Sequence, residues 1–172
     1  MIDKKIADML VDQVNKEMYS GYLYLDFANY YADEGLDGFA KWYEVQAREE
    51  LDHALMMRRY LIDNGVRVTL DKIAKPDKKL AAFVDPLNYG YEHEQYVTSL
   101  INAIYHEAVA QKDYKTMQFL DWFIKEQGEE EKNAEDLLKK MKLFGGEAKG
   151  LYALDQELGA RVYTPSTTGP AM

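Results

Sequence analysis

The sequence predicts an all-α protein, a four-helix bundle with one long crossover and a short fifth helix near the C-terminal end. The four prolines stand at positions 76, 86, 165 and 170, and the proline-free tracts 1–75 and 87–164 favour long helices. In both tracts apolar residues recur at steps of three and four, the period of one helix face, while alternating patterns are nearly absent. The length of 172 residues suits one domain, placed at 1–160, followed by a tail at 161–172 that we expect to be disordered.

The first tract holds two predicted helices. It divides at residues 33–38, where two glycines can end one helix and Asp37 can cap the next. This predicts helices near 3–34 and 37–64. An Asn-Gly pair at 64–65 is a strong stop signal, and the stretch up to the second proline predicts a crossover of about twenty residues. A crossover of that length can carry the chain along the whole bundle.

The second tract holds two more long helices and the short one. We expect helices at 87–111 and 114–144, separated by the Lys-Asp pair at 112–113 and stopped by two glycines at 145–146. The apolar stretch 151–158 predicts the fifth helix, which ends at the next glycine.

The composition restricts the possible functions. Thirty acidic against 21 basic side chains give a formal charge of −9, which disfavours nucleic acid or an anionic membrane as a partner and favours cations. The absence of cysteine excludes disulfides, thiol catalysis and cysteine-ligated metal clusters. No apolar run reaches the length of a membrane span, and the first residues lack the apolar core of a signal peptide. We therefore expect a cytoplasmic protein.

Carboxylates interrupt the apolar stripe of every long predicted helix. The polar residues on these inner faces are Glu17, Glu50, His53, Glu94, Gln127 and Glu130. An isolated ionised carboxylate in a low-dielectric interior is prohibitively costly, so the negative charges on the four helices must be compensated together. Lysine and arginine mostly lie off these stripes, which favours a bound cation. Oxygen ligands with a single imidazole suit iron, manganese or a similarly hard divalent ion.

A weak internal repeat also favours a shared site. Four pairs stand 77 positions apart: Glu17 and Glu94, Glu49 and Glu126, Glu50 and Gln127, and His53 and Glu130. If the two halves pack about a pseudo-two-fold axis, the members of each pair meet at one depth in the bundle.

Each feature taken alone has a simpler interpretation. The acidic run 129–131 is typical of a solvated helix face, and a Glu and a His three positions apart often only touch each other. Tyr24 is typical of a core tyrosine with a satisfied hydroxyl. His93 and His106 follow no pattern and are assigned to the surface or an interface. The coincidence of six polar residues on four inner faces is what favours a metal site.

The order and spacing of these residues resemble the ferritin family over nearly the whole chain. The matching segments are 15–20 (NKEMYS) with Tyr24, 48–54 (REELDHA), 91–94 (YEHE) and 126–132 (EQGEEEK). Glu50-x-x-His53 is intact, but its counterpart is Gln127-x-x-Glu130. This departure is similar to bacterial and archaeal non-haem ferritins, because bacterioferritins and rubrerythrin-like proteins keep a second Glu-x-x-His. Leu51 stands where bacterioferritins carry the haem-ligating Met, so no haem is expected.

The resemblance implies iron storage with ferroxidase activity, in which O2 or H2O2 oxidises Fe(II) to Fe(III) at a di-iron centre. It implies a first iron at Glu17, Glu50 and His53. It implies a second iron at Glu50, Glu94 and Glu130, with Gln127 hydrogen-bonding nearby. Tyr24 would donate an electron or hold a ligand by hydrogen bonding. Glu49, Glu126 and Glu129, together with Glu130, resemble a third iron site.

The resemblance also implies a homo-oligomer, a hollow cage of about 24 chains (a 24-mer) that stores ferric mineral. In animal cages two carboxylates line a three-fold pore, but the matching positions here are Met117 and Leu120, and Asp121 is only a neighbouring candidate. The route of iron uptake therefore stays open. Two other functions also stay open: a small di-metal oxidoreductase that stores nothing, and a non-catalytic helical scaffold whose acids face solvent.

Overall fold

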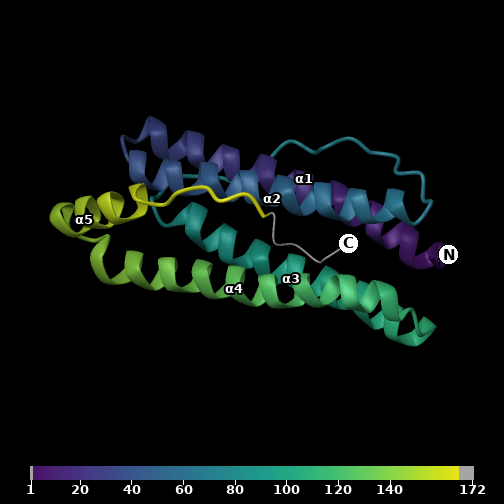
Figure 1. Cartoon of the computed structure of the whole chain (residues 1–172). Helices are drawn as coiled ribbons and strands as arrows, with labels where there is room; N and C mark the ends of the chain where they lie inside the picture. The colour runs from purple at the N-terminus through teal and green to yellow at the C-terminus, as the bar shows by residue number, and fades with distance from the viewer. Residues whose placement is uncertain (1, 167–172) are drawn as a thin grey trace.

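The computed structural model describes residues 2–166, and this part of the chain forms five helices and no strand. Helices α1 (Lys4–Asp33) and α2 (Asp37–Asp63) form one antiparallel pair, and α3 (Asp85–Gln111) and α4 (Tyr114–Phe144) form the second (Figure 1). The short helix α5 (Ala148–Gly159) lies at one end of the bundle. The predicted all-α bundle with a crossover and a short fifth helix is confirmed.

The segment between α2 and α3 returns the chain to the other end of the bundle. Residues 64–84 contain no regular helix and run along the outside of the α1–α2 pair (Figure 1). Asn15 of α1 holds this segment, because its side-chain amide donates to the Lys72 carbonyl and its side-chain oxygen accepts from the Asp71 N–H, each at 3.2 Å. As a result α2 and α3 run parallel, and the inner faces of the four long helices meet.

The helix ends follow local capping chemistry. Asp3 accepts from the backbone N–H two residues on at 2.8 Å, and Asp113 accepts from the backbone N–H of Thr116 at 3.1 Å, so α1 and α4 both begin at a side-chain cap. Gly35 and Gly65 have φ angles of +77° and +75°. That conformation favours glycine, which explains why α1 and α2 end where the sequence predicts.

Two helices begin earlier than predicted. Helix α3 begins at Asp85, two residues early, because Pro86 fits the first turn of a helix, where no N–H is needed. The Asp85 carboxylate also accepts from the backbone N–H groups of Ala81 and Ala82 at 2.8 Å each, which fixes the entry to the helix. Helix α5 begins at Ala148, three residues before the predicted start.

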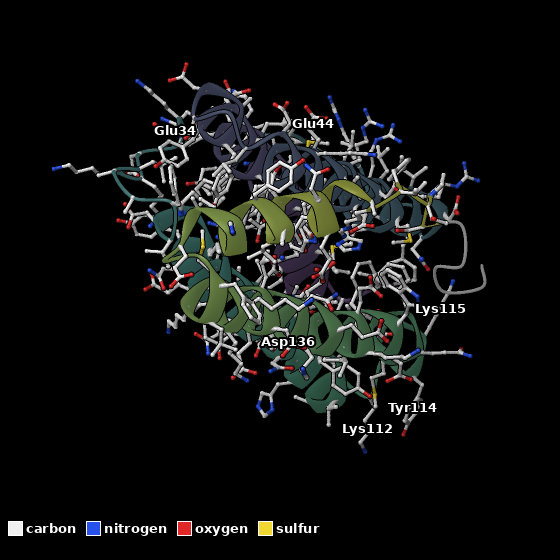
Figure 2. All side chains as sticks on the ribbon, turned by 90° about the vertical axis from the view of Figure 1, so that its left-hand side faces the viewer. Glu34, Glu44, Lys112, Tyr114, Lys115 and Asp136 are labelled. Atoms are coloured by element: carbon white, nitrogen blue, oxygen red, sulfur yellow. The ribbon has the colours of Figure 1, made fainter. Side chains whose placement is uncertain are left out.

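Helix α5 supplies the cap of α2. The prediction that Asp37 caps this helix is wrong, because the N-cap residue is Leu36, which makes no side-chain hydrogen bond. Instead Oδ1 of Asp155 in α5 accepts from the backbone N–H groups of Gly38 at 2.8 Å and Phe39 at 3.0 Å. Figure 2, viewed from this end, shows α5 lying between the two helix pairs. The cap therefore ties α5 to the bundle.

The core consists of two apolar clusters with a polar layer between them. The cluster nearer α5 is rich in aromatic rings, among them Tyr31, Phe39 and Tyr43, and the other is mostly aliphatic. On each long helix one or two buried polar residues lie between the segments that belong to the two clusters: Glu17, Glu50 with His53, Glu94, and Gln127 with Glu130. None of the described helices is long and apolar enough to cross a membrane.

Residues 160–166 leave α5 and run back beside α2 (Figure 1), and we call them the C-terminal strap. The hydroxyl of Tyr163 and the backbone N–H of Ser166 both donate to Oδ2 of Asp52, at 2.7 and 3.1 Å. Residues 161–166, the first part of the tail for which the sequence predicts disorder, have no regular secondary structure and make these contacts. The rest of that predicted tail, 167–172, lies outside the described residues.

Candidate metal centre

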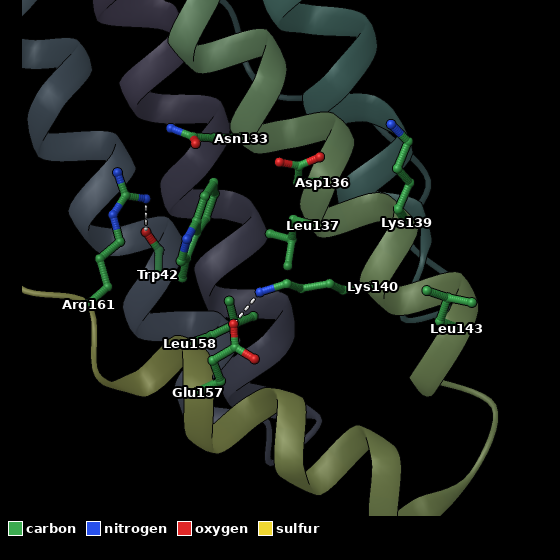
Figure 3. A pocket seen from close by; sticks show the side chains of 10 residues that line it. All are labelled: Trp42, Asn133, Asp136, Leu137, Lys139, Lys140, Leu143, Glu157, Leu158 and Arg161. Atoms are coloured by element: carbon green, nitrogen blue, oxygen red, sulfur yellow. Dashed lines mark hydrogen bonds and ion pairs between the residues drawn. The ribbon is translucent and has the colours of Figure 1, made fainter.

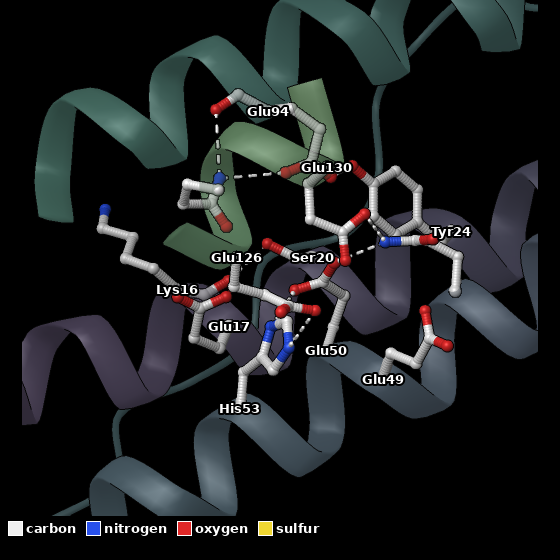
Figure 4. A network of polar contacts seen from close by, with 12 residues as sticks. Lys16, Glu17, Ser20, Tyr24, Glu49, Glu50, His53, Glu94, Glu126 and Glu130 are labelled. Atoms are coloured by element: carbon white, nitrogen blue, oxygen red, sulfur yellow. Dashed lines mark hydrogen bonds and ion pairs between the residues drawn. The ribbon is translucent and has the colours of Figure 1, made fainter. Parts of the chain in front are cut away.

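The polar layer brings together the six polar residues of the inner stripes. They are Glu17 from α1, Glu50 and His53 from α2, Glu94 from α3, and Gln127 and Glu130 from α4, and none is more than 4% exposed. Residues three apart share a helix face, so the two pairs on α2 and α4 both point inward. Figure 4 shows Glu17, Glu50, His53, Glu94 and Glu130 converging from the four helices.

Their ligand atoms form two groups that share Glu50. Glu17, Glu50 and His53 each offer one atom within 4.8 Å of the others, and Glu50, Glu94 and Glu130 do the same. These are the residues that the family resemblance implies for the first and the second iron. His53, Glu126 and Glu130 form a third group with the same spacing.

Two buried atoms of the first group lack a hydrogen-bond partner within the described residues. They are Oε2 of Glu17 and Nε2 of His53. Leaving a buried polar atom unsatisfied costs about 1–3 kcal/mol. Nδ1 of His53 lies 3.3 Å from Oε2 of Glu50, so the ring is oriented and its other nitrogen is available. A metal ion would satisfy both atoms, and the donor set fits one.

The buried carboxyl groups favour the protonated form when no cation is present. Burial raises the pKa of Glu17, Glu50, Glu94 and Glu130 from 4.5 to about 8, and a neighbouring carboxylate adds to the effect for each of them. A divalent cation among them would favour the ionised form instead. Binding of a metal ion at this layer would therefore be coupled to proton release.

Two glutamines without a predicted role orient the ligands. Nε2 of Gln13 donates to Oε1 of Glu17 at 2.8 Å, and Nε2 of Gln46 donates to Oε1 of Glu50 at 3.0 Å. Gln46 also donates to Oε2 of Glu130 at 2.7 Å, so one amide joins two ligands. Each glutamine precedes its glutamate by one helical turn, and this spacing on the inner stripe is the signal that could have identified them.

Gln127 and Tyr24 hold the two oxygens of Glu94. Nε2 of Gln127 donates to Oε2 at 3.2 Å, and the Tyr24 hydroxyl donates to Oε1. Burial raises the pKa of Tyr24 well above 10, so this hydroxyl stays a neutral donor. The Tyr24 ring also packs on Tyr43, with 5.6 Å between centroids, and meets His93 edge-on at 5.8 Å.

His93, which the sequence assigns to the surface or an interface, is partly buried. Its Nε2 lies 2.7 Å from Oγ of Ser20, and its ring packs against Tyr19, Tyr24 and Tyr96. Burial lowers the pKa of His93 to about 4, with a smaller contribution from the charge of a nearby lysine. It is therefore a neutral supporting residue behind Tyr24. His106 is exposed, as predicted.

The three outer glutamates are gathered less closely than the inner ligands. Oε1 of Glu126 lies 4.0 Å from Nε2 of His53, within the third group. Glu49 is partly buried and forms an ion pair with Arg161 at 2.5 Å. Glu129 is exposed and pairs with a lysine one turn before it at 3.5 Å. The structure thus places one of the three, Glu126, among the inner ligands.

Sequence comparison shows which known proteins the chain is similar to. The family model of the Ferritin-like domain matches residues 7–144. The chain is 36% identical over 156 residues to the bacterial non-heme ferritin of Campylobacter jejuni, which covers 91% of this chain and 93% of that protein. It is 35% identical over 161 residues to the bacterial non-heme ferritin of Bacteroides fragilis, which covers 94% and 100%.

Solved structures agree with the sequence comparison. An engineered closed form of Archaeoglobus fulgidus ferritin superposes with a TM-score of 0.93 at 39% identity, covering 95% of this chain and 100% of that one. A humanized archaeal ferritin gives 0.94 at 40% identity, with 96% and 100% covered. Since the domain match spans most of the chain and the relatives match nearly end to end, the chain belongs to the ferritin family.

Proposed function

We propose that this protein stores iron and oxidises Fe(II) to Fe(III) at the two groups that share Glu50, with O2 or H2O2 as the electron acceptor. The observation that carries the proposal is that one buried carboxylate belongs to both groups, so it can hold two metal ions side by side. Two Fe(II) ions give up one electron each, the number that reduces O2 to H2O2 or H2O2 to water. The non-heme ferritin names of the relatives support iron as the metal.

In this proposal the inner ligands divide between two ions. Glu17, Glu50 and His53 bind the first iron, and Glu50 joins Glu94 and Glu130 at the second. Carboxylate oxygens are hard, highly charged ligands that favour Fe(III) over Fe(II), so they promote electron loss and retain the product. The four glutamate ligands release their protons as Fe(II) binds, because burial raises their pKa values to about 8 in the metal-free protein.

Gln127 and Tyr24 support the second iron. The amide of Gln127 keeps Glu94 oriented, as the Tyr24 hydroxyl does from the other oxygen. Tyr24 either donates an electron or only holds this ligand. If it donates one, its hydroxyl proton has a direct acceptor in Oε1 of Glu94.

We also propose a third iron at Glu126 and Glu130, completed by Glu49 and Glu129. The close spacing of Glu126, Glu130 and His53 supports an ion on this side of the centre. Glu49 and Glu129 would first have to leave their ion pairs with basic side chains. Iron would pass through this third position on its way from the oxidation centre to the mineral.

Storage of iron as a mineral requires an enclosed space. We propose that the chain assembles in the cytoplasm into a homo-oligomeric cage of about 24 chains (a 24-mer). One similar solved structure is described as an open pore ferritin of Archaeoglobus fulgidus, at a TM-score of 0.91 and 38% identity. That likeness supports assembly, and the mass of the particle in solution would test it.

The test is aerobic loading of metal-free protein with Fe(II), followed by measurement of particle mass and of iron per chain. We expect a large particle that keeps far more than two ions per chain in solution. A double variant, Glu50→Ala with His53→Ala, should oxidise Fe(II) at the background rate. Glu44→Ala, an exposed glutamate on the same helix, is the matched control and should behave as wild type.

Two other results would point elsewhere. About two ions per chain, without mineral, would indicate a di-metal oxidoreductase that stores nothing. An unchanged oxidation rate in the double variant would indicate a helical scaffold whose carboxylates have no role in oxidation.

A further inference from the structure

We propose that Arg161 of the C-terminal strap is an internal counter-cation, which occupies Glu49 and must move away before a third metal ion can bind there. The inference rests on the proposed function, because it assigns the strap a role at the same centre. It makes the C-terminal segment a regulator of the third ion and leaves the first two ions to the inner ligands.

The guanidinium group of Arg161 is held at four points on α2. Its Nη2 lies 2.5 Å from Oε2 of Glu49 and donates to Oε1 of Gln46 at 3.0 Å. Its Nη1 donates to the Trp42 carbonyl at 3.3 Å, and its central carbon lies 4.4 Å from the centroid of the Trp42 ring. Figure 3 shows the guanidinium beside Trp42. The Arg161 and Glu49 side chains are each 20% exposed, so the ion pair is partly sheltered from water.

The Gln46 amide connects Arg161 to two buried carboxylates of the polar layer. Gln46 accepts from Arg161 and donates to both Glu50 and Glu130. Among the described residues, no other arginine or lysine forms an ion pair with Glu49 or with a carboxylate of the three ligand groups. Within the described residues, Arg161 is therefore the basic side chain that pairs with a carboxylate next to the polar layer.

A metal ion and the guanidinium exclude each other at Glu49. Both would bind the same carboxylate oxygens, and two positive charges a few ångströms apart repel strongly where water is scarce. An ion that uses Glu49 must therefore displace Arg161, and Arg161 must weaken the binding of that ion. The two effects are reciprocal by thermodynamic linkage.

The strap is attached in a way that permits this displacement. Beyond Leu158, none of the described residues is buried. Backbone hydrogen bonds from Ala160 and Arg161 to the last turn of α5 anchor the start of the strap. Its other contacts include hydrogen bonds to Asp52 and a cation–π contact of Arg48 with Tyr163 at 5.7 Å. A segment held without buried apolar side chains can detach while the bundle stays folded. Arg161 also lines a cavity of about 580 Å³ between α4 and α5 (Figure 3), which gives the displaced side chain room.

The first experiment is an anaerobic calorimetric titration of the metal-free assembled protein with Fe(II). We expect Arg161→Gln to bind the third ion about fivefold more tightly than wild type, the upper range for an ion pair that is partly exposed, and to keep the first two ions. Arg161→Lys, which retains the charge, should restore weak binding of the third ion. Arg58→Gln removes the same charge from an exposed position on α2 and is the control.

The second experiment follows the strap itself by hydrogen exchange of the peptide that contains residues 160–166. In wild type its exchange should rise as the third ion binds and not with the first two. In Glu49→Gln the added Fe(II) should cause no such rise. The inference would be overturned if wild type and Arg161→Gln bound the third ion with equal affinity. It would also be overturned if hydrogen exchange of the strap did not change at saturating Fe(II). Absence of the first two ions would instead overturn the proposed function.

Discussion

Glu130 is the residue of α4 that belongs to two of the three groups of possible metal ligands. It is buried, and its Oε2 accepts from Gln46. Glu129, the preceding residue, faces away from the layer and pairs with a lysine. Adjacent residues on a helix point in directions about 100° apart, so one of these two glutamates faces the buried layer and the other faces solvent.

This contrast predicts a division between two variants. Glu130→Ala should slow the first phase of aerobic Fe(II) oxidation by tenfold or more, since it removes a proposed ligand of the second and third ions. Glu129→Ala should leave the first phase unchanged and affect only later iron uptake. Stopped-flow absorbance of the ferric product measures both phases, and equal losses in the two variants would contradict the division.

The glutamine behind the first ion predicts a separate effect. Gln13→Leu keeps the side-chain volume but removes the donor to Glu17, so the first ion should bind about tenfold more weakly, the usual cost of losing an outer-shell partner. The second ion should be unaffected. Anaerobic titration with Co(II) measures both affinities, and Gln118→Leu, on an exposed position of α4, is the control. A first-ion affinity equal to wild type would exclude this role.

The sequence predicts the buried carboxylates of the polar layer but not all of the side chains that contact them. Glu17, Glu50 and Glu94 stand out because a carboxylate on an apolar stripe needs an explanation. Gln13 lies on the same stripe, yet a neutral amide among apolar residues points to no chemistry by itself. Arg161 contacts Glu49 across 112 positions, and no local pattern encodes a pair that only the path of the strap brings together.

At the scale of helices, the internal repeat also appears at one pair of helix starts. Helix α2 begins at Asp37 and α4 at Tyr114, 77 positions apart, like the paired ligands. The long helices could be predicted because their periodicity and glycine stops are local. The start of α3 is missed because the Asp85 carboxylate binds the preceding turn, and the cap of α2 is missed because it comes from Asp155 on a distant helix.

The cap from α5 predicts a stability effect. Asp155→Ala removes the acceptor of two backbone N–H groups at the start of α2 and should lower the free energy of unfolding by about 1–2 kcal/mol. Gly38→Ala should also displace α5, since a Cβ there would lie 1.7 Å from the Asp155 carbonyl oxygen. Urea unfolding followed by circular dichroism measures the change. Glu157→Ala, an exposed residue of α5, should change stability much less, and an equal loss would argue against the cap.

At the scale of the whole molecule, the buried carboxyl groups set the pH dependence of stability. Their pKa values rise from 4.5 to about 8 on folding, so between these values the folded chain binds more protons than the unfolded chain. The stability of the metal-free protein should therefore fall as the pH rises from about 5 to about 8. Bound metal should reverse the loss, because it stabilises the ionised ligands.

Thermal unfolding in the presence of a chelator tests this pH dependence. The midpoint temperature of wild type should decrease across the window, and Glu50→Gln, which is neutral at every pH, should show a shallower decrease. A midpoint that rises from pH 5 to pH 8 in the metal-free protein would contradict the coupling of the carboxyl groups to folding.

The pairing of two ions on one shared carboxylate is the central claim, and a burst titration tests it most directly. Metal-free protein is loaded anaerobically with increasing Fe(II) and mixed rapidly with O2, and the amount oxidised in the fast phase is measured per chain. We predict two ions per chain in wild type and in Glu44→Ala, and no fast phase in Glu50→Ala. A fast phase of one ion per chain, or one that survives in Glu50→Ala, would contradict the claim.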